Sequence, residues 1–336
     1  MFLAEYDDAR ADVRETGREE AVDGVADADG GGQDERRRRV LAMIAYVMWW
    51  IGVAWMTGTL VFVMGVLTGA LGGPSERWML RKGAGAGGEE EEEVRITMPR
   101  CLLSSAFGMG LVAAVGGLLV SVLVKLGTIS VGMAATVLVL AFCVVGVAVF
   151  TTLFLYAVLQ QEMIHVESQE SIPLVMLSLW MAGTVSVCGA AVLMLGSAAE
   201  DVSAILGDTN GHGGQEGNLF TPATAQIAHI VCTILALLLL GLVALLFIFT
   251  LVGFVSLSIR GRLSWKVQWS DGVIPVAALA LLMVQFRAES DSAFFGIVTC
   301  LLVVAAAAAL LINLVLCIKQ VVSGTFLTAL DDELRV

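Results

Sequence analysis

Charged side chains are scarce in this chain, and their scarcity excludes an ordinary water-soluble domain. Charged residues make up 15% of the sequence, whereas hydrophobic residues make up 58%. A typical soluble domain carries about 25% charged residues. Together with a mean hydropathy of +0.87, the composition predicts a membrane protein.

Cysteine and histidine are also few, and neither residue type is arranged for catalysis or metal binding. All six cysteines fall within or at the edge of apolar stretches, without a CxxC pair, so we expect them to pack as small hydrophobic side chains. The three histidines, His165, His212 and His229, are isolated in the sequence and lack metal-ligand spacing. The sequence also lacks a hydrolase elbow, an HExxH motif and a phosphate-binding loop. We therefore expect no enzyme activity, no metal and no other cofactor.

The negative charge of the chain is concentrated in two segments. Most of the net charge of −12 lies in the N-terminal tail and in the five glutamates at positions 89–93. Charge runs flanked by glycine are typical of solvated segments. We predict a disordered acidic tail over residues 1–39 and a loop over residues 72–98, and we expect no nucleic-acid partner. Since the first 35 residues do not resemble a signal peptide, the first apolar span would direct membrane insertion.

What the chain has in quantity is long apolar stretches. A bilayer core of about 30 Å needs about 20 apolar residues in a helix, and only helices or closed barrels satisfy their backbone groups there. We predict an all-α, polytopic helical bundle over residues 40–320, followed by a short tail over residues 321–336. The seven expected spans are 40–71, 101–124, 131–159, 172–196, 227–259, 267–286 and 294–318. We expect the bundle to be embedded in a lipid bilayer.

Lysine and arginine are distributed unequally between the loops of this bundle. Such residues accumulate in cytoplasmic loops, and ten of them share one side: Arg77, Arg81, Lys82, Arg95, Arg100, Arg260, Arg262, Lys266, Lys319 and Arg335. The opposite loops contribute Lys125 and Arg287. Four arginines at 36–39 contradict this orientation when seven crossings are counted. Either these arginines determine only the orientation of the N-terminal end of the first span, or the chain lacks a crossing upstream of Val40.

Three of the five prolines lie in alternate spans. Pro99 and Pro173 are expected at helix starts, where the missing N–H would be unbonded anyway. Pro275 is expected deeper in its span, where it would bend the helix.

Glycines and hydroxyl side chains accompany these prolines. The glycines permit close helix packing, and they also suit a pore wall. Hydroxyls on the same spans either bond to their own helix or donate to a passing anion. The candidates are Ser104, Ser105, Ser178, Thr184 and Ser186.

Several motifs occur in the order found in one transporter family. The C-terminal block reads Trp269-Ser270-Asp271-Gly272-Val273-Ile274-Pro275, then Phe294-Phe295, then Val321-Val322-Ser323-Gly324-Thr325-Phe326. Two further matches are Met98-Pro99-Arg100-Cys101 with Ala106-Phe107-Gly108-Met109-Gly110, and Glu167-Ser168-Gln169-Glu170-Ser171-Ile172-Pro173-Leu174. Over about 280 residues of spacing and order, the chain resembles the tellurite-resistance/dicarboxylate transporter family, which includes malic-acid permeases, sulfite efflux pumps and slow anion channels.

The resemblance implies an architecture of ten helices, arranged as five hairpins around a central pore. The seven spans would correspond to helices two, three, four, five, eight, nine and ten, with the proline-bearing spans as inner helices three, five and nine. The chain would then be incomplete relative to the family, without its first, sixth and seventh helices. Absence of the first helix would also account for the misplaced arginines at 36–39.

The resemblance also implies a function. We expect transport of a small anion, such as a C4-dicarboxylate like malate, or sulfite, across the plasma membrane by a homo-oligomer, a trimer as in the family. The anion would pass along the proline-bearing spans, selected by pore width, helix dipoles and hydroxyls. Besides the five hydroxyls, Phe107 and Pro275 would line the pathway, since Phe107 is the nearest aromatic on an inner span to the family's obstructing phenylalanine.

Asp271 departs from the family motif and has two interpretations. An acid within a span costs about 2.5–3.5 kcal/mol on insertion scales, so it would have a function, paired with Arg100 or Lys266 or carrying a proton. Alternatively, Asp271 lies in the interface just outside a short span.

Two other classes of protein fit the seven spans. A chain with three of five inner helices could be a non-transporting membrane remnant or an incomplete gene model of the family. A seven-helix receptor is disfavoured, because the sequence lacks an acidic-Arg-aromatic triplet after the third span and an N-P-x-x-Y motif in the seventh.

Overall fold

The computed structural model describes residues 31–72, 88–165, 172–209, 221–259 and 272–322. The chain divides into two units, residues 1–47 and residues 48–336. The described part of the first unit is the helical stretch 31–47. Within the described ranges the chain is helical and contains no strand. Among the described residues, seven helices are long and apolar enough to cross a membrane. The predicted all-α, seven-span class is therefore confirmed.

Except for α8, the described helices are longer than the membrane spans expected from hydropathy. Their bounds are α2 Gly31–Gly72, α4 Gly88–Lys125, α5 Val131–His165, α6 Ile172–Thr209, α7 Pro222–Ile259, α8 Val273–Ser290 and α9 Ala293–Val322. A helix can continue into water after its apolar part ends, and hydropathy detects only the apolar part.

Two of the helix starts differ from the expected boundaries. Helix α4 begins at Gly88, so residues 88–98 are helical and Pro99 lies inside the helix, not at its start. Helix α2 begins at Gly31, within the tail predicted to be disordered. Residues 267–271 of the sixth expected span lie outside the described residues. Helix α8 is described from Val273, and Pro275 lies in its first turn. There the missing N–H of proline costs nothing, so the expected bend has no cause.

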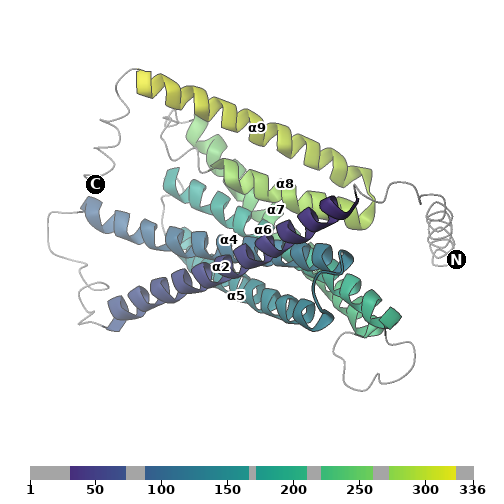
Figure 1. Ribbon diagram of the computed structural model, residues 1–336. Helices are drawn as coiled ribbons and strands as arrows, with labels where there is room; N and C mark the ends of the chain where they lie inside the picture. Colours follow the sequence, from purple (N-terminus) through teal and green to yellow (C-terminus); the bar gives the residue numbers. More distant parts are fainter. Residues whose placement is uncertain (1–30, 73–87, 166–171, 210–220, 260–271, 323–336) are drawn as a thin grey trace. The chain divides into compact units, whose positions relative to one another are not determined.

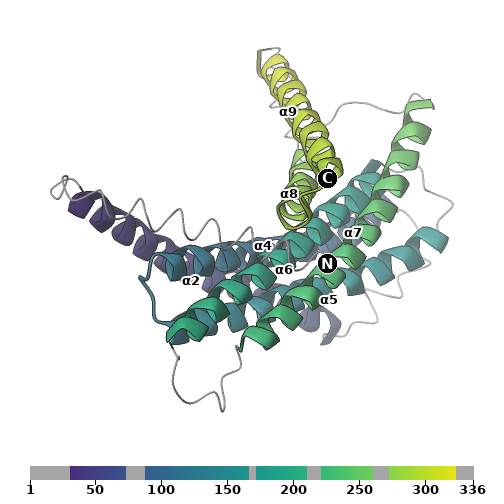
Figure 2. The same cartoon turned by 90° about the vertical axis from the view of Figure 1, so that its right-hand side faces the viewer.

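Helix α6 occupies the centre of residues 48–336. It contacts α4, α5, α7 and α8, whereas α9 packs on α8 (Figures 1 and 2). In its membrane-spanning stretch, 94% of α6 is buried inside the protein, compared with 6% for α9. Consequently α6 contacts protein on all sides, and α9 presents most of its surface outwards.

Two glycines allow α6 to approach its neighbours at backbone distance. A Cβ placed on Gly183 would lie 2.6 Å from Cα of Pro275 in α8, far inside normal contact. A Cβ on Gly117 of α4 would lie 3.1 Å from the backbone carbonyl of Met194 in α6. Small residues at such crossings allow close van der Waals packing, which is the main attraction between helices in lipid.

A tight turn joins α4 to α5. Gly127 adopts a left-handed φ of 61°, and the N–H of Thr128 donates to the carbonyl of Leu123 at 3.1 Å. This pattern caps the last carbonyls of a helix and favours glycine at the left-handed position. It returns the chain at once, so α4 and α5 run antiparallel.

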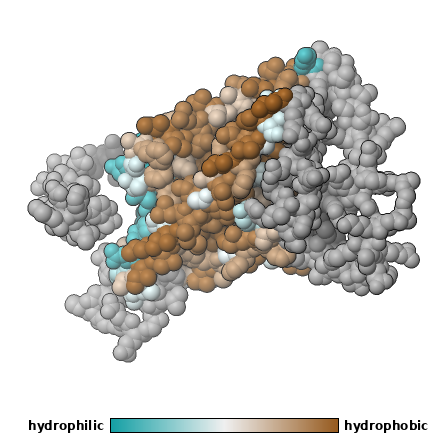
Figure 3. Space-filling view, turned by 180° about the vertical axis from the view of Figure 1, so that it is seen from behind, coloured by the Kyte–Doolittle hydropathy of each residue, from teal (hydrophilic) through white to brown (hydrophobic). Residues whose placement is uncertain are grey.

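The outer surface is apolar. Large side chains on α5, α7 and α9 are exposed, among them Phe150, Ile259 and Val304. From behind, hydrophobic residues dominate the described surface and hydrophilic residues gather at its edge (Figure 3). A surface of this kind suits the hydrocarbon of a bilayer and not water.

Candidate functional site

The three proline-bearing spans are α4, α6 and α8. Helix α6 packs directly against the other two. Helix α6 touches α8 through Gly183 and Pro275, and it touches α4 where a Cβ on Gly110 would lie 3.0 Å from Val187. Phe107 of α4 also packs edge-on against Trp180 of α6, with ring centroids 5.9 Å apart. In this structure, therefore, the helices predicted to line a lumen are packed against each other.

The hydroxyls predicted on α6 all bond to their own helix. Ser178 donates to the carbonyl of Val175 at 2.8 Å, and its oxygen also lies 2.8 Å from that of Thr250 in α7. Thr184 and Ser186 donate to the carbonyls of Trp180 and Ala182, at 2.9 and 2.7 Å. An anion is bound by hydrogen-bond donors, and each hydroxyl has one proton to donate. These three donors are already in use.

Ser105 on α4 is the exception. Its side chain is buried, and among the described residues its hydroxyl has no hydrogen-bond partner. One turn further along the same face, Met109 lines a cavity of about 140 Å³ between α2, α4 and α5, which Thr57 and Cys143 also line. Ser105 therefore lies away from the α6 contact, while Ser104 is exposed.

The structure does not describe two of the remaining predicted residues. Asp271 and Lys266, one of its suggested partners, lie outside the described residues. Pro173 is the second residue of α6, at the helix start where it was expected.

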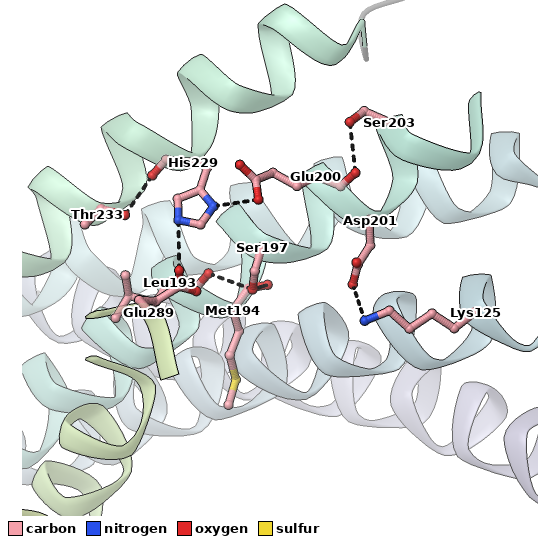
Figure 4. Close-up of polar contacts among 10 residues, drawn as sticks. All are labelled: Lys125, Leu193, Met194, Ser197, Glu200, Asp201, Ser203, His229, Thr233 and Glu289. Carbon is pink, nitrogen blue, oxygen red and sulfur yellow. Dashed lines mark hydrogen bonds and ion pairs between the residues drawn. The ribbon is translucent and has the colours of Figure 1, made fainter. Parts of the chain in front are cut away.

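A polar cluster at one end of the bundle was not predicted. His229 of α7 lies between two carboxylates, with Nε2 3.0 Å from Glu289 of α8 and Nδ1 3.2 Å from Glu200 of α6 (Figure 4). Beside it, Lys125 of α4 pairs with Asp201 of α6 at 3.0 Å. Four helices therefore meet here through charged side chains. We call His229, Glu200 and Glu289 the histidine cluster.

The histidine cluster and the ion pair between Lys125 and Asp201 show the directions of the helices. Glu200 and Glu289 lie near the C-terminal ends of α6 and α8, and Lys125 is the last residue of α4. His229 lies near the N-terminal end of α7. Helices α4, α6 and α8 therefore run in one direction and α7 in the other.

A groove lies at the other end of the bundle, between α6, α7, α8 and α9. Its volume is about 330 Å³. Aliphatic and aromatic side chains such as Leu179, Phe247 and Phe254 dominate its walls, with Thr250 and Asn313 as its polar members. Such a lining suits hydrocarbon better than an anion, which loses hydration in an apolar site.

Comparison with protein families identifies the class of membrane protein. The model of the voltage-dependent anion channels matches residues 26–318, which is most of the chain. The chain belongs to the voltage-dependent anion channel family. No curated protein and no solved structure gives a match.

Membership in the voltage-dependent anion channel family confirms the resemblance seen in the motifs. It makes this protein a multi-pass membrane protein of a class of anion channels and transporters, and it removes the reason to consider a receptor. Residues 26–318 include every described helix from α4 to α8. The candidate hydroxyls and the histidine cluster therefore both lie inside the matched region.

The histidine cluster was not predicted, because the residues next to each histidine in the sequence give no sign of a partner on another helix. His229 is separated from Glu200 and from Glu289 by long stretches of sequence. One signal was available: all three residues lie near those ends of their spans that alternate crossing brings to the same side of the membrane.

Proposed function

We propose that this protein carries a small anion across the plasma membrane, with a C4-dicarboxylate such as malate, or sulfite, as its substrate. The family match over residues 26–318 carries the proposal. Seven apolar helices supply the membrane-spanning body that such an activity needs. The motifs shared with malic-acid permeases and sulfite efflux pumps favour these two substrate classes.

Ser105 is the side chain we propose as an anion contact. Its hydroxyl proton is uncommitted among the described residues, whereas the donors of Ser178, Thr184 and Ser186 bond to their own helix. A donor held away from water, with no competing acceptor, stabilises a passing anion more than one that must first break a bond.

Flux through reconstituted vesicles tests the proposal. Purified protein in liposomes should take up labelled malate or sulfite faster than empty liposomes, with chloride and nitrate as comparison anions. Ser105→Ala should lower the uptake rate about tenfold, the effect of losing one hydrogen bond to a charged group. The matched control is Ser186→Ala, which removes an equally buried hydroxyl whose donor is already used. Its rate should stay near that of the parent protein.

Two results would decide against this assignment. Uptake equal to that of empty liposomes for every anion would favour the alternative of a non-transporting member of the family. Uptake that Ser186→Ala reduces as strongly as Ser105→Ala would remove Ser105 as a specific contact.

We also propose a homotrimer. The exposed apolar length of α9 offers surface for subunit contact as well as for lipid. Native mass spectrometry of the protein in nanodiscs should give three copies per particle, and a single copy would contradict the proposal.

A further inference from the structure

The histidine cluster joins three helices through one side chain. The imidazole of His229 faces Glu289 with one ring nitrogen and Glu200 with the other (Figure 4). His229 and Glu289 are mostly buried, with side-chain exposures of 19% and 22%, whereas Glu200 is 46% exposed. The Nδ1 contact is at ion-pair distance, but it is not aligned as a hydrogen bond.

The number of ring protons decides whether both contacts are attractive. A neutral imidazole carries one N–H, so one nitrogen would present a lone pair to a carboxylate oxygen. The imidazolium carries two N–H groups and one positive charge, and it attracts both carboxylates. The bridge between α7, α6 and α8 is therefore complete only when a proton is bound.

The charged side chains next to the histidine cluster pair with other residues or face another helix. On α6, the neighbouring Asp201 is paired with Lys125 of α4 at 3.0 Å. On α8, the guanidinium of Arg287 lies 3.3 Å from the Cβ position of Gly296, and so faces α9. On α7, the titratable neighbour is Cys232, one turn along the helix, which packs against Gly196 of α6.

We propose that His229, Glu200 and Glu289 form a proton-binding site that ties α7 and α8 to α6. The bound proton converts two carboxylates facing a neutral ring into a three-member ion pair across the helix ends. Release of the proton removes the positive charge and leaves one of the two carboxylates facing a nitrogen lone pair, which loosens these ends. The site holds α6 and α8 together at the C-terminal end of α8, whereas Gly183 and Pro275 hold them together at its N-terminal end. The proposal does not depend on which anion is carried.

Double-mutant cycles at two pH values test the site. The variants are His229→Gln, which cannot gain a charge, Glu289→Gln, and the two combined, in the full-length protein in nanodiscs. At about pH 5.5 the melting temperatures should show a coupling of about 2 °C or more between the two positions. At about pH 8.5 the coupling should be clearly smaller, because the neutral ring keeps one N–H for a hydrogen bond to Glu289 but loses its positive charge. Glu200→Gln should give a smaller coupling in the same direction, because Glu200 is more exposed and its contact is poorly aligned.

The ion pair Lys125–Asp201 provides the matched control at the same end of the bundle. A cycle of Lys125→Met and Asp201→Asn should give the same coupling at both pH values, because neither group ordinarily titrates between them. A coupling between His229 and Glu289 that is absent at the lower pH, or unchanged at the higher pH, would overturn the proposal. If His229→Gln does not fold, the pH dependence of the parent melting temperature must still be weaker in Glu289→Gln, and an unchanged dependence would also overturn it.

Discussion

At Gly183 the absence of a side chain is a requirement of the packing. The backbone of Pro275 already occupies the space that a Cβ would need, at 2.6 Å. Because a backbone cannot swing aside as a flexible side chain can, Gly183→Ala must push α6 and α8 apart. We expect a loss of about 1–3 kcal/mol in the free energy of unfolding, the usual effect of overpacking.

Thermal unfolding of the purified protein measures this loss against Gly146→Ala. A Cβ at Gly146 on α5 would meet nothing within 4 Å. That control should unfold at the parent temperature or slightly above it, since alanine favours helix over glycine by up to about 1 kcal/mol. Equal melting temperatures for the two variants would show that α6 and α8 are not in backbone contact.

The candidate residues were only partly predictable from the sequence. Helical spacing and residue type suggested that Ser178, Thr184 and Ser186 either bond to their own helix or face an anion, and the structure has the first arrangement. The partner of a side chain on another helix is not encoded locally. The isolation of His229 in the sequence was therefore misleading, because Glu200 and Glu289 reach it from other helices.

At the scale of helices, one tryptophan joins α2 to α4. The buried Trp49 donates from Nε1 to the backbone carbonyl of Val112 at 2.9 Å, and Gly116 leaves room for the indole ring. Phenylalanine keeps most of the ring and removes the donor. We expect Trp49→Phe to lower the free energy of unfolding by about 0.5–1 kcal/mol, the range found for interhelical hydrogen bonds in membranes.

Trp55→Phe is the natural comparison, because the Trp55 side chain is 72% exposed on the same helix. Chemical unfolding in mild detergent should show a lower midpoint for Trp49→Phe and an unchanged one for Trp55→Phe. Two equal midpoints would mean that the indole N–H of Trp49 contributes nothing to the contact between α2 and α4.

The existence of the helices followed from hydropathy, but their ends did not. An apolar stretch identifies the part of a helix that needs lipid, and α6 continues beyond it to Thr209 through polar residues. Similarly, the five glutamates at 89–93 predict a loop, yet in the structure they form part of the first turns of α4. Negative side chains at a helix N-terminus are stabilised by the helix dipole, a local effect that a count of charges overlooks.

At the scale of the whole molecule, the helix directions predict which turns share a side of the membrane. The turn after α4 and the turn after α8 follow helices that run in the same direction. Counting lysine and arginine assigns both turns to the non-cytoplasmic side. Thr128→Cys and Ser292→Cys should therefore react with a membrane-impermeant maleimide on intact cells, above the background from native cysteines in the parent protein.

Lys266→Cys supplies the opposite case. The same counting places it in the cytoplasm, so its labelling should require permeabilised cells. If Thr128→Cys and Ser292→Cys labelled on different sides, the direction of α4 relative to α8 would be wrong. If both required permeabilisation, the helix directions would stand and the orientation in the membrane would be reversed.

The enclosure of α6 also bears on how the protein is made. Its mean hydropathy is lower than that of α4, α5, α7 and α9, because a helix surrounded by protein can carry serine, threonine and glycine where a lipid-facing helix carries leucine. During synthesis, however, α6 leaves the ribosome before α7 and α8, the helices that cover two of its sides. For that interval its hydroxyls and glycines face lipid or the insertion machinery. Helix α6 is therefore the span whose stable residence in the membrane depends on the arrival of later ones, and synthesis halted before α7 would leave it the least securely inserted of the central helices.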